Sequence, residues 1–327
     1  MRRLLLLSAF CLLECAAETP LGLPPVPIPK DNQATPAAIQ LGSRLFFSPL
    51  LSVNSSISCA TCHNPGTGFA EPKAVSSGVG GKQGNRNAPG LLNSAYYTSQ
   101  FWDGRAATLE AQAAGPMMNP IEMAHNPSGI EKRLALNPQF QKLFTEAYGA
   151  GPITIDKVTR ALASFERQLI SGNSPFDRFQ YGHEKDAMSP AAQRGLKVFQ
   201  DPAKGNCTAC HLIGAHNALF TDNKFHNLGV GLNPEGELTD LGRYAVTKKD
   251  GDQGAFKTPI LRNVAKTAPY MHDGSLKTLK EVVDFYVGGG SSNPYRDKQI
   301  KPLTHLSKQE RADLVAFLES LNGEPTK

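Results

Sequence analysis

Two short segments of this chain follow the pattern Cys-x-x-Cys-His, and no other feature constrains its fold as strongly. They are residues 59–63 and 207–211. In this pattern the two cysteines form thioethers to a c-type haem, and the adjoining histidine ligates its iron. A zinc site would need a second pair of thiols nearby, and a redox disulfide would not need the histidine. The sequence therefore predicts two covalently bound haem c groups, attached and ligated through Cys59, Cys62, His63, Cys207, Cys210 and His211.

The remaining two of the six cysteines, Cys11 and Cys15, lie in a stretch that is organised as a signal peptide. Two arginines precede an apolar run over residues 4–13, and the small residues at 15–17 suit a cleavage site. We therefore expect a signal peptide over residues 1–17. Because c-type haem is attached outside the cytoplasm, we expect the mature protein in a bacterial periplasm.

The sequence offers no membrane-spanning segment, and the alternative form of membrane attachment is a lipid anchor. The apolar run is too short to span a bilayer, and no later stretch approaches about 18 apolar residues. An acylated Cys15 would anchor the chain as a lipoprotein, although Glu14 beside it fits such a signal poorly. The formal net charge of +5 becomes +4 once residues 1–17 are removed. So mild a charge gives no reason to expect nucleic acid or a membrane surface as a partner, and we expect neither.

Each haem motif is preceded by the same arrangement of residues. Thr35 and Ser189 are each followed by proline, which predicts a hydroxyl N-cap with proline at the first helical position. A glycine, an apolar residue followed by phenylalanine and a turn containing proline then lead to the first cysteine of each motif. This internal repeat predicts two cytochrome c-like domains, which we place at residues 18–180 and 181–327.

Further helices are predicted from apolar spacing and capping patterns. Residues 155–170 have an apolar helical face and lead into a linker through 175–181. Capping boxes begin at Thr278 and Ser307, and three glycines at 288–290 end the first of these two helices. No convincing alternating strand pattern occurs. The predicted fold class is therefore mainly α, with long loops in a chain of 30 glycines and 24 prolines.

Polar and aromatic residues gather between the two motifs. Residues 100–105 include Trp102, the only tryptophan, and Gln112 and Glu122 follow. An indole beside redox cofactors could relay electrons, and the alternative is an aromatic anchor of the core. Glu122 could exchange a proton with an oxygen at the iron, and the alternative is a solvated glutamate at a helix start. The residues alone leave both alternatives open.

Taken together, these motifs resemble those of the bacterial di-haem cytochrome c peroxidase family, which includes a maturase of methylamine utilisation. The resemblance covers nearly all of the expected mature chain. It rests on ordered blocks, namely the two haem motifs and residues 86–89, 100–105, 116–123, 225–229, 257–263 and 268–274.

The resemblance implies a role for each candidate residue. His63 would ligate the peroxidatic haem and His211 the electron-transfer haem, with Trp102 between the two. Gln112 and Glu122 match the pair that positions peroxide and moves its proton.

The same resemblance implies one calcium ion between the haems. Its ligands would be the side chain of Asn87 and the backbone carbonyls of Thr267 and Pro269. Because backbone ligands tolerate many side chains, the assignment depends mostly on Asn87.

One departure from the family pattern concerns access to the first iron. Peroxidases of this family carry a histidine in the loop after the first motif, and it blocks the iron until the other haem is reduced. Here no histidine lies between His63 and His125. We therefore expect the first haem to be open in the protein as isolated, as in the maturase branch.

The sixth ligand of the second haem is a choice between two residues. The family uses Met or Tyr at the position of Tyr286, and Met271 is the rival thioether. A phenolate stabilises ferric iron more than a thioether does. His226 and His272 are less suited as ligands, and we expect them to form hydrogen bonds to propionates or backbone.

Three functions follow from this reading. The first is reduction of hydrogen peroxide to water, with electrons from a small c-type cytochrome or cupredoxin that docks near the second haem. The second is oxidation of amino-acid side chains of a partner protein. The third is a di-haem electron carrier, which would leave Gln112 and Glu122 without a purpose. The sequence leaves the possibility of a homodimer open.

Overall fold

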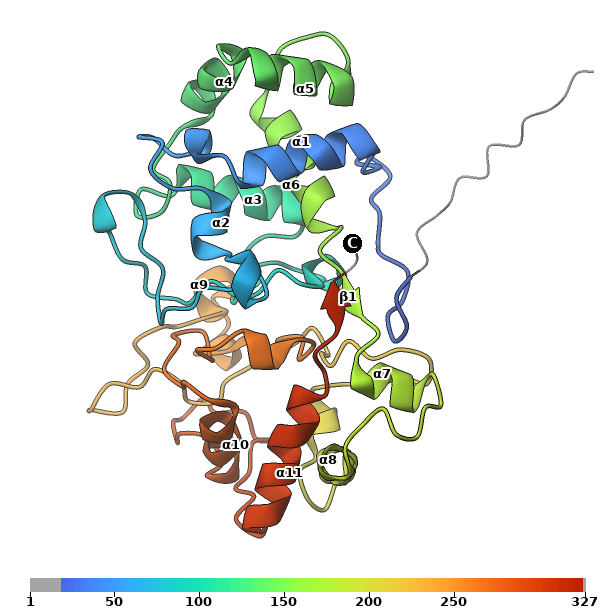
Figure 1. Ribbon diagram of the computed structural model, residues 1–327. Helices are drawn as coiled ribbons and strands as arrows, with labels where there is room; N and C mark the ends of the chain where they lie inside the picture. Colours follow the sequence, from blue (N-terminus) through green and yellow to red (C-terminus); the bar gives the residue numbers. More distant parts are fainter. Residues whose placement is uncertain (1–18, 326–327) are drawn as a thin grey trace, which may run out of the picture.

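The computed structural model describes residues 19–325, and the expected signal peptide with Cys11 and Cys15 lies outside this range. The described chain is mainly helical, as predicted, with long loops between the helices (Figure 1). No helix within that range is long and apolar enough to cross a membrane.

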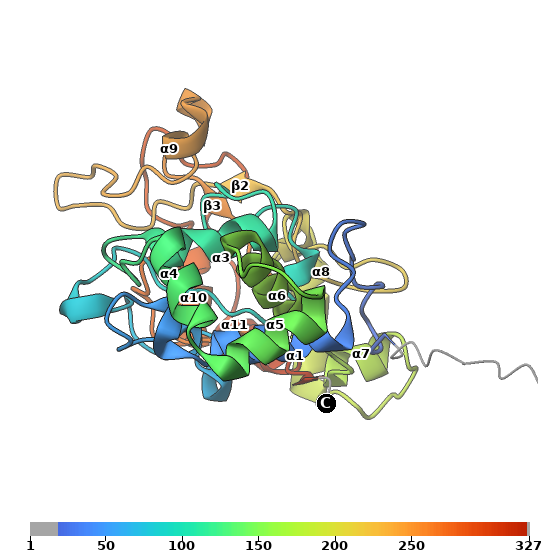
Figure 2. The ribbon, with the colours of Figure 1, turned by 90° about the horizontal axis from the view of Figure 1, so that it is seen from above.

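The helices divide between the two halves of the chain, which lie one above the other in Figure 1. The first half contains α1 (Pro36–Phe46), α2 (Cys59–Cys62), α3 (Leu109–Met118), α4 (Pro127–Ala135), α5 (Pro138–Tyr148) and α6 (Ile155–Glu166). The second half contains α7 (Pro175–Gln180), α8 (Pro190–Gln200), α9 (Tyr244–Thr247), α10 (Leu279–Val287) and α11 (Lys308–Glu319). Seen from above, α9 lies at an edge of the molecule, far from α1 (Figure 2).

The helix starts follow the sequence predictions. The Thr35 hydroxyl accepts a hydrogen bond from the amide of Ala38, and Ser189 accepts one from Ala192. Thr278 and Ser307 each form the predicted capping box with a glutamate three residues later. Local hydrogen bonding therefore fixes where α1, α8, α10 and α11 begin.

The segment after α6 differs from the prediction in two ways. The helix ends at Glu166 rather than near residue 170, because β1 (Ser171–Gly172) pairs antiparallel with β4 (Glu324–Pro325). The side-chain amide of Asn93 also accepts from the Ser171 amide and donates to its carbonyl, both at 2.9 Å. In addition, the expected linker contains α7, which starts at a capping box of Ser174 and Asp177.

A second small antiparallel pair, β2 (Phe225–His226) with β3 (Phe256–Lys257), completes the described sheet structure. Both pairs are only two residues long, so they tie loops together without forming a separate layer. Their partners lie far apart in the sequence, which explains why no strand pattern could be recognised locally.

Two glycines set the packing of each half. A Cβ on Gly42 of α1 would lie 1.9 Å from the carbonyl oxygen of Ala161 on α6. A Cβ on Gly195 of α8 would lie 1.9 Å from the carbonyl oxygen of Asp313 on α11. The absence of a side chain therefore lets each helix pair cross in close contact.

Each crossing is surrounded by its own apolar core. The core of the first half contains buried residues from Leu41 to Leu169, and the core of the second contains buried residues from Phe176 to Leu321. Phe176, on the first side of the expected boundary at residue 180, packs in the second core. The boundary itself stays a prediction.

Candidate active site

The first haem motif forms α2 and the residue that follows it. His63 Nδ1 lies 3.1 Å from the carbonyl oxygens of Phe69 and Pro89, which fixes the ring and leaves Nε2 for a metal. Burial lowers the pKa of His63, so the imidazole is neutral, as a ligand must be. Burial likewise raises the pKa of the Cys59 thiol to about 12 and that of Cys62 to about 11.

The second motif repeats this geometry. His211 Nδ1 lies 2.7 Å from the carbonyl oxygen of Phe220, and burial lowers the pKa of the imidazole. Cys207, Cys210 and His211 line a largely apolar cavity of about 720 Å³. None of the four cysteines in the described residues forms a disulfide. Free thiol pairs and carbonyl-oriented histidines fit c-type haem in both halves.

The cavity brings together both candidates for the sixth ligand of the second haem. Tyr286 and Met271 line it together with His211. Burial raises the pKa of the Tyr286 phenol above its usual range, and charge on Cys207 and Cys210 adds to this. Both side chains therefore lie in the cavity that Cys207, Cys210 and His211 line.

Two other histidines that line this cavity, His226 and His272, contact neighbouring side chains. His226 Nδ1 lies 2.5 Å from Asp297 and its Nε2 lies 3.1 Å from Asp222, so carboxylates engage both ring nitrogens. Cys210, Asp222 and His226 are close enough to share a metal ion, but Cys210 is also the second cysteine of the second Cys-x-x-Cys-His motif. His272 stacks on Phe256 with ring centroids 3.6 Å apart, and burial lowers its pKa to about 4. These contacts suit structural roles.

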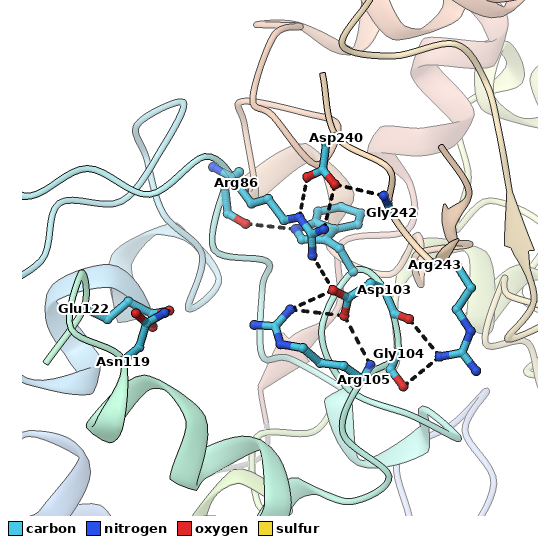
Figure 3. Close-up of polar contacts among 11 residues, drawn as sticks. Arg86, Asp103, Gly104, Arg105, Asn119, Glu122, Asp240, Gly242 and Arg243 are labelled. Carbon is cyan, nitrogen blue, oxygen red and sulfur yellow. Dashed lines mark hydrogen bonds and ion pairs between the residues drawn. The ribbon is translucent and has the colours of Figure 1, made fainter. Parts of the chain in front are cut away.

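The predicted distal residues lie on α3 and in the turn after it. Glu122 is half-buried and accepts a 2.7 Å hydrogen bond from the side chain of Asn119 (Figure 3). Burial raises its pKa, against that hydrogen bond and the charge of Arg105. Its charge also acts on the Cys62 thiol, which places it beside the first haem motif. Gln112 is half-buried, and its side-chain amide has no hydrogen-bond partner within residues 19–325.

Trp102 lies where the two halves meet. Its indole Nε1 donates to the carbonyl oxygen of Asn87 at 2.8 Å, and its own carbonyl accepts from the amide of Lys257 at 2.8 Å. Trp102 also lines the cavity that holds the second motif. Both ends of the residue are therefore tied, one to each half of the chain.

The three expected calcium ligands also face this cavity, since Asn87, Thr267 and Pro269 line it. Asn87 is buried and donates from its amide nitrogen to the carbonyl oxygen of Lys73 at 2.7 Å. This assignment points its amide oxygen away from that contact. Within the described residues, neither the Thr267 nor the Pro269 carbonyl accepts a backbone hydrogen bond.

A charged network next to Trp102 was not identified from the sequence. Arg86 bonds to Asp103 at 2.7 Å and to both oxygens of Asp240 at 2.6 and 2.8 Å (Figure 3). Arg105 pairs with the same Asp103, and Arg243 donates to the carbonyls of Asp103 and Gly104. Arg86 stands in a family block, but nothing near it in sequence indicated Asp240, which lies 154 residues away.

Known proteins resemble this chain in both sequence and fold. A family model described as di-haem cytochrome c peroxidase matches residues 36–185, and one described as cytochrome c matches residues 192–322. Methylamine utilization protein MauG of Methylorubrum extorquens is 42% identical over 301 residues, which is 92% of this chain and 82% of that protein. Cytochrome c551 peroxidase of Pseudomonas aeruginosa is 36% identical, covering 87% of this chain and 78% of the other.

The solved structures give the same relationship. A MauG-like protein associated with microbial copper homeostasis superposes with a TM-score of 0.83 at 32% identity, covering 94% of this chain and 95% of the other. A variant of the diheme peroxidase BthA from Burkholderia thailandensis gives a TM-score of 0.77 at 25% identity, with coverage of 88% and 86%. The match extends over both halves of the chain.

Proposed function

This chain belongs to the di-haem cytochrome c peroxidase family, and we propose that it reduces hydrogen peroxide to water with electrons from a small redox protein. Each turnover consumes one peroxide, two electrons and two protons and yields two waters. The observation that carries the proposal is the shielded carboxyl of Glu122 beside Cys62 of the first haem motif. An electron carrier would have no use for a proton-exchanging group at that position.

The chain's own residues supply the proton chemistry. Cys59, Cys62 and His63 would hold the first haem, which would supply the iron chemistry for cleavage of the peroxide O–O bond. Glu122, whose raised pKa favours the protonated form, moves a proton to the leaving oxygen. Gln112 has an unengaged amide and orients the peroxide. Asn119 holds the Glu122 carboxyl in place.

Electron supply uses the second half of the chain. Cys207, Cys210 and His211, together with Tyr286, would hold the second haem, and this haem would supply electron transfer towards the first. Trp102 lies on this route, bonded to both halves. We propose a small c-type cytochrome or a cupredoxin as the donor, docking near the second haem.

A second candidate function is oxidation of side chains in a partner protein. Two observations favour it. A relative that is 42% identical bears the name methylamine utilization protein MauG. The chain also has tyrosine, Tyr286, at the position where the family uses Met or Tyr, and this residue lines the cavity of the second motif. A phenolate stabilises highly oxidised haem.

The state of the first haem follows from its loop. Because no histidine lies between His63 and His125, we propose an iron with an open sixth position in the protein as isolated. Electron paramagnetic resonance of the ferric protein should show a high-spin signal. A wholly low-spin spectrum that converts only on partial reduction would contradict this.

One experiment tests the main proposal. Stopped-flow mixing of the protein with peroxide, with and without a reduced small cytochrome c, should give a fast spectral change at the haems and then oxidation of the cytochrome. If the protein does not react with peroxide, the proposal is wrong and the protein is better described as a di-haem electron carrier. A reaction with peroxide but no cytochrome oxidation would favour a protein substrate.

Three further assignments are part of this proposal. We propose one calcium ion at Asn87, Thr267 and Pro269, supported by their shared cavity and by the unengaged carbonyls. We propose a periplasmic location, supported by the signal-peptide pattern of residues 1–17 and by covalent haem. A homodimer stays open and can be tested by light scattering.

A further inference from the structure

The two helix crossings allow the halves of the chain to be compared residue by residue. Gly42 meets the carbonyl of Ala161 and the Cβ of Phe165, and Gly195 meets the carbonyl of Asp313 and the Cβ of Phe317. Ala161 is therefore equivalent to Asp313, and Phe165 to Phe317. The next residue on each helix makes a third equivalent pair, Glu166 of α6 and Leu318 of α11.

The two members of this pair differ in chemistry. Leu318 packs in the second core and lines the cavity that contains Cys207 and His211. An apolar side chain is the expected neighbour of a haem face. In the first half the same place is taken by a carboxyl group.

Glu166 is deeply buried beside the first haem motif. The residue is only 5% exposed, and its Oε2 has no hydrogen-bond partner within the described residues. Its charge acts directly on Cys59, the first thioether position. An unpaired buried carboxyl is costly and calls for an explanation.

The charged groups around Glu166 do not neutralise it. Arg167, the next residue on α6, is bound in two places by Glu110 of α3, at 2.7 and 3.1 Å. Cys59, the first residue of α2, interacts electrostatically with Glu166. Burial raises the pKa of Glu166 to about 8, Arg167 lowers it and Glu110 raises it. The group can therefore change its charge state near neutral pH.

We propose that Glu166 is a redox-linked proton acceptor of the first haem. When one electron reduces that haem, the Glu166 carboxylate takes one proton from solvent; when the haem is oxidised, the carboxyl group releases it. No covalent bond to the haem forms or breaks. The proposal needs the haem at Cys59 but does not depend on peroxide as substrate.

The physical basis is reciprocal coupling between two charges. An oxidised haem carries one more positive charge than a reduced one, so it favours the carboxylate and lowers its pKa. By the same free energy, the carboxylate favours the oxidised haem and lowers its reduction potential. The effect is strong only because the site is shielded from water.

The test is a redox titration of the complete di-haem protein at several pH values, followed by paramagnetic resonance so that the two haems are resolved. In the wild type the potential of the first haem should fall as the pH rises. In Glu166→Gln that slope should be flattened, while the slope of the second haem is unchanged and serves as the internal control. An unchanged slope at the first haem would overturn the proposal.

Two further measurements guard against a folding defect. Glu166→Leu copies Leu318, so it should pack beside a haem, and it should flatten the slope as Glu166→Gln does. In the wild type, infrared difference spectra should show a protonated carboxyl band that appears on reduction of the first haem and is lost in both variants. If the wild type lacks such a band, the proposal is wrong whatever the variants do.

Discussion

Single residues distinguish the two halves of the chain, because a position that carries a carboxyl group in the first half carries an apolar side chain in the second. The backbones of α6 and α11 meet their partner helices in the same way, yet one helix presents Glu166 where the other presents Leu318. Glu122 likewise places a carboxyl beside the first motif. Carboxyl groups therefore lie beside the first motif at Glu122 and Glu166, whereas the cavity of the second motif is largely apolar.

Glu122 gives the sharpest test at this scale. Glu122→Gln keeps the hydrogen-bonding shape but cannot exchange a proton, so peroxide-driven oxidation should slow by about 10²–10⁴-fold. Both haems should stay bound and reducible. The measurement is single-turnover stopped flow.

The matched control for that variant is Glu146→Gln. Glu146 lies in the same half, is exposed, and pairs only with Lys142 at 3.7 Å. It should react at the wild-type rate. Full peroxide turnover in Glu122→Gln would make Glu122 a structural carboxylate.

Tyr286 provides a second residue-scale prediction. Tyr286→Phe should leave the second haem five-coordinate or with a replacement ligand, and its reduction potential should rise because the phenolate is lost. Low-temperature spectra and a redox titration measure both effects. Met271→Leu is the matched control, since Met271 lines the same cavity. If only the Met271 variant changes the spectrum, the thioether is the ligand.

The roles of residues in local motifs could be predicted from the sequence, whereas the burial and contacts of single residues could not. The haem motifs could be assigned from the sequence because their chemistry depends on a fixed local spacing. The state of Glu166 could not, since its burial and its lack of a partner depend on α2, α3 and α6 packing together. The sequence predicted only that this position lies in a helix with an apolar face.

At the scale of elements, helix starts were predicted from local contacts, whereas one helix end depends on contacts with residues far away in the sequence. The starts of α1, α8, α10 and α11 depend on hydrogen bonds within four residues and were predicted. The end of α6 depends on Asn93 and on β4, both far away in the sequence, and was predicted too late. The α7 helix was missed although Ser174 and Asp177 form a local capping box.

The helix crossings make an element-scale prediction. Gly195→Ala would put a Cβ against the backbone of Asp313, and because backbone cannot move aside as a side chain can, stability should fall by about 1–3 kcal/mol or more. Loss of the second haem should be the first symptom. Gly42→Ala should do the same to the first haem.

Gly251→Ala is the control for both substitutions. A Cβ on Gly251 would meet nothing within 4 Å, so this variant should unfold as the wild type does in a denaturant titration followed at the haem absorption. If Gly195→Ala retains full stability and both haems, α8 and α11 can separate without cost and the crossing does not hold the second half together.

At the scale of the whole molecule, the two halves are joined by charge. Arg86 reaches from the first half to Asp240 of the second, and Arg243 reaches back to the carbonyls of Asp103 and Gly104. The network adjoins Trp102 through Asn87, the residue after Arg86. This ion pair and these hydrogen bonds therefore connect the segments that carry the two haem motifs.

Removing Arg86 should uncouple the halves. Arg86→Gln leaves the largely buried Asp240 carboxylate without its cation and leaves Asp103 with Arg105 alone. Breaking a buried pair from one side costs about 3–5 kcal/mol. We expect guanidinium unfolding, a single transition in the wild type, to separate into two. Lys142→Gln removes only an exposed pair and should change nothing.

Acidification provides an independent test of the contact between the two halves at Arg86 and Asp240. Although burial opposes it, hydrogen bonds from Arg86 lower the pKa of Asp240. A carboxyl with a lowered pKa stabilises the fold above its unfolded pKa, and this contribution is lost as the pH falls through the folded value. The wild type should therefore lose coupling between its halves on acidification, and Asp240→Asn, which has no carboxyl to protonate, should show little further loss. Equal acid sensitivity in the wild type and Asp240→Asn would mean that other contacts, such as the 2.6 Å hydrogen bond from Lys257 Nζ to the carbonyl oxygen of Ser99, hold the halves together.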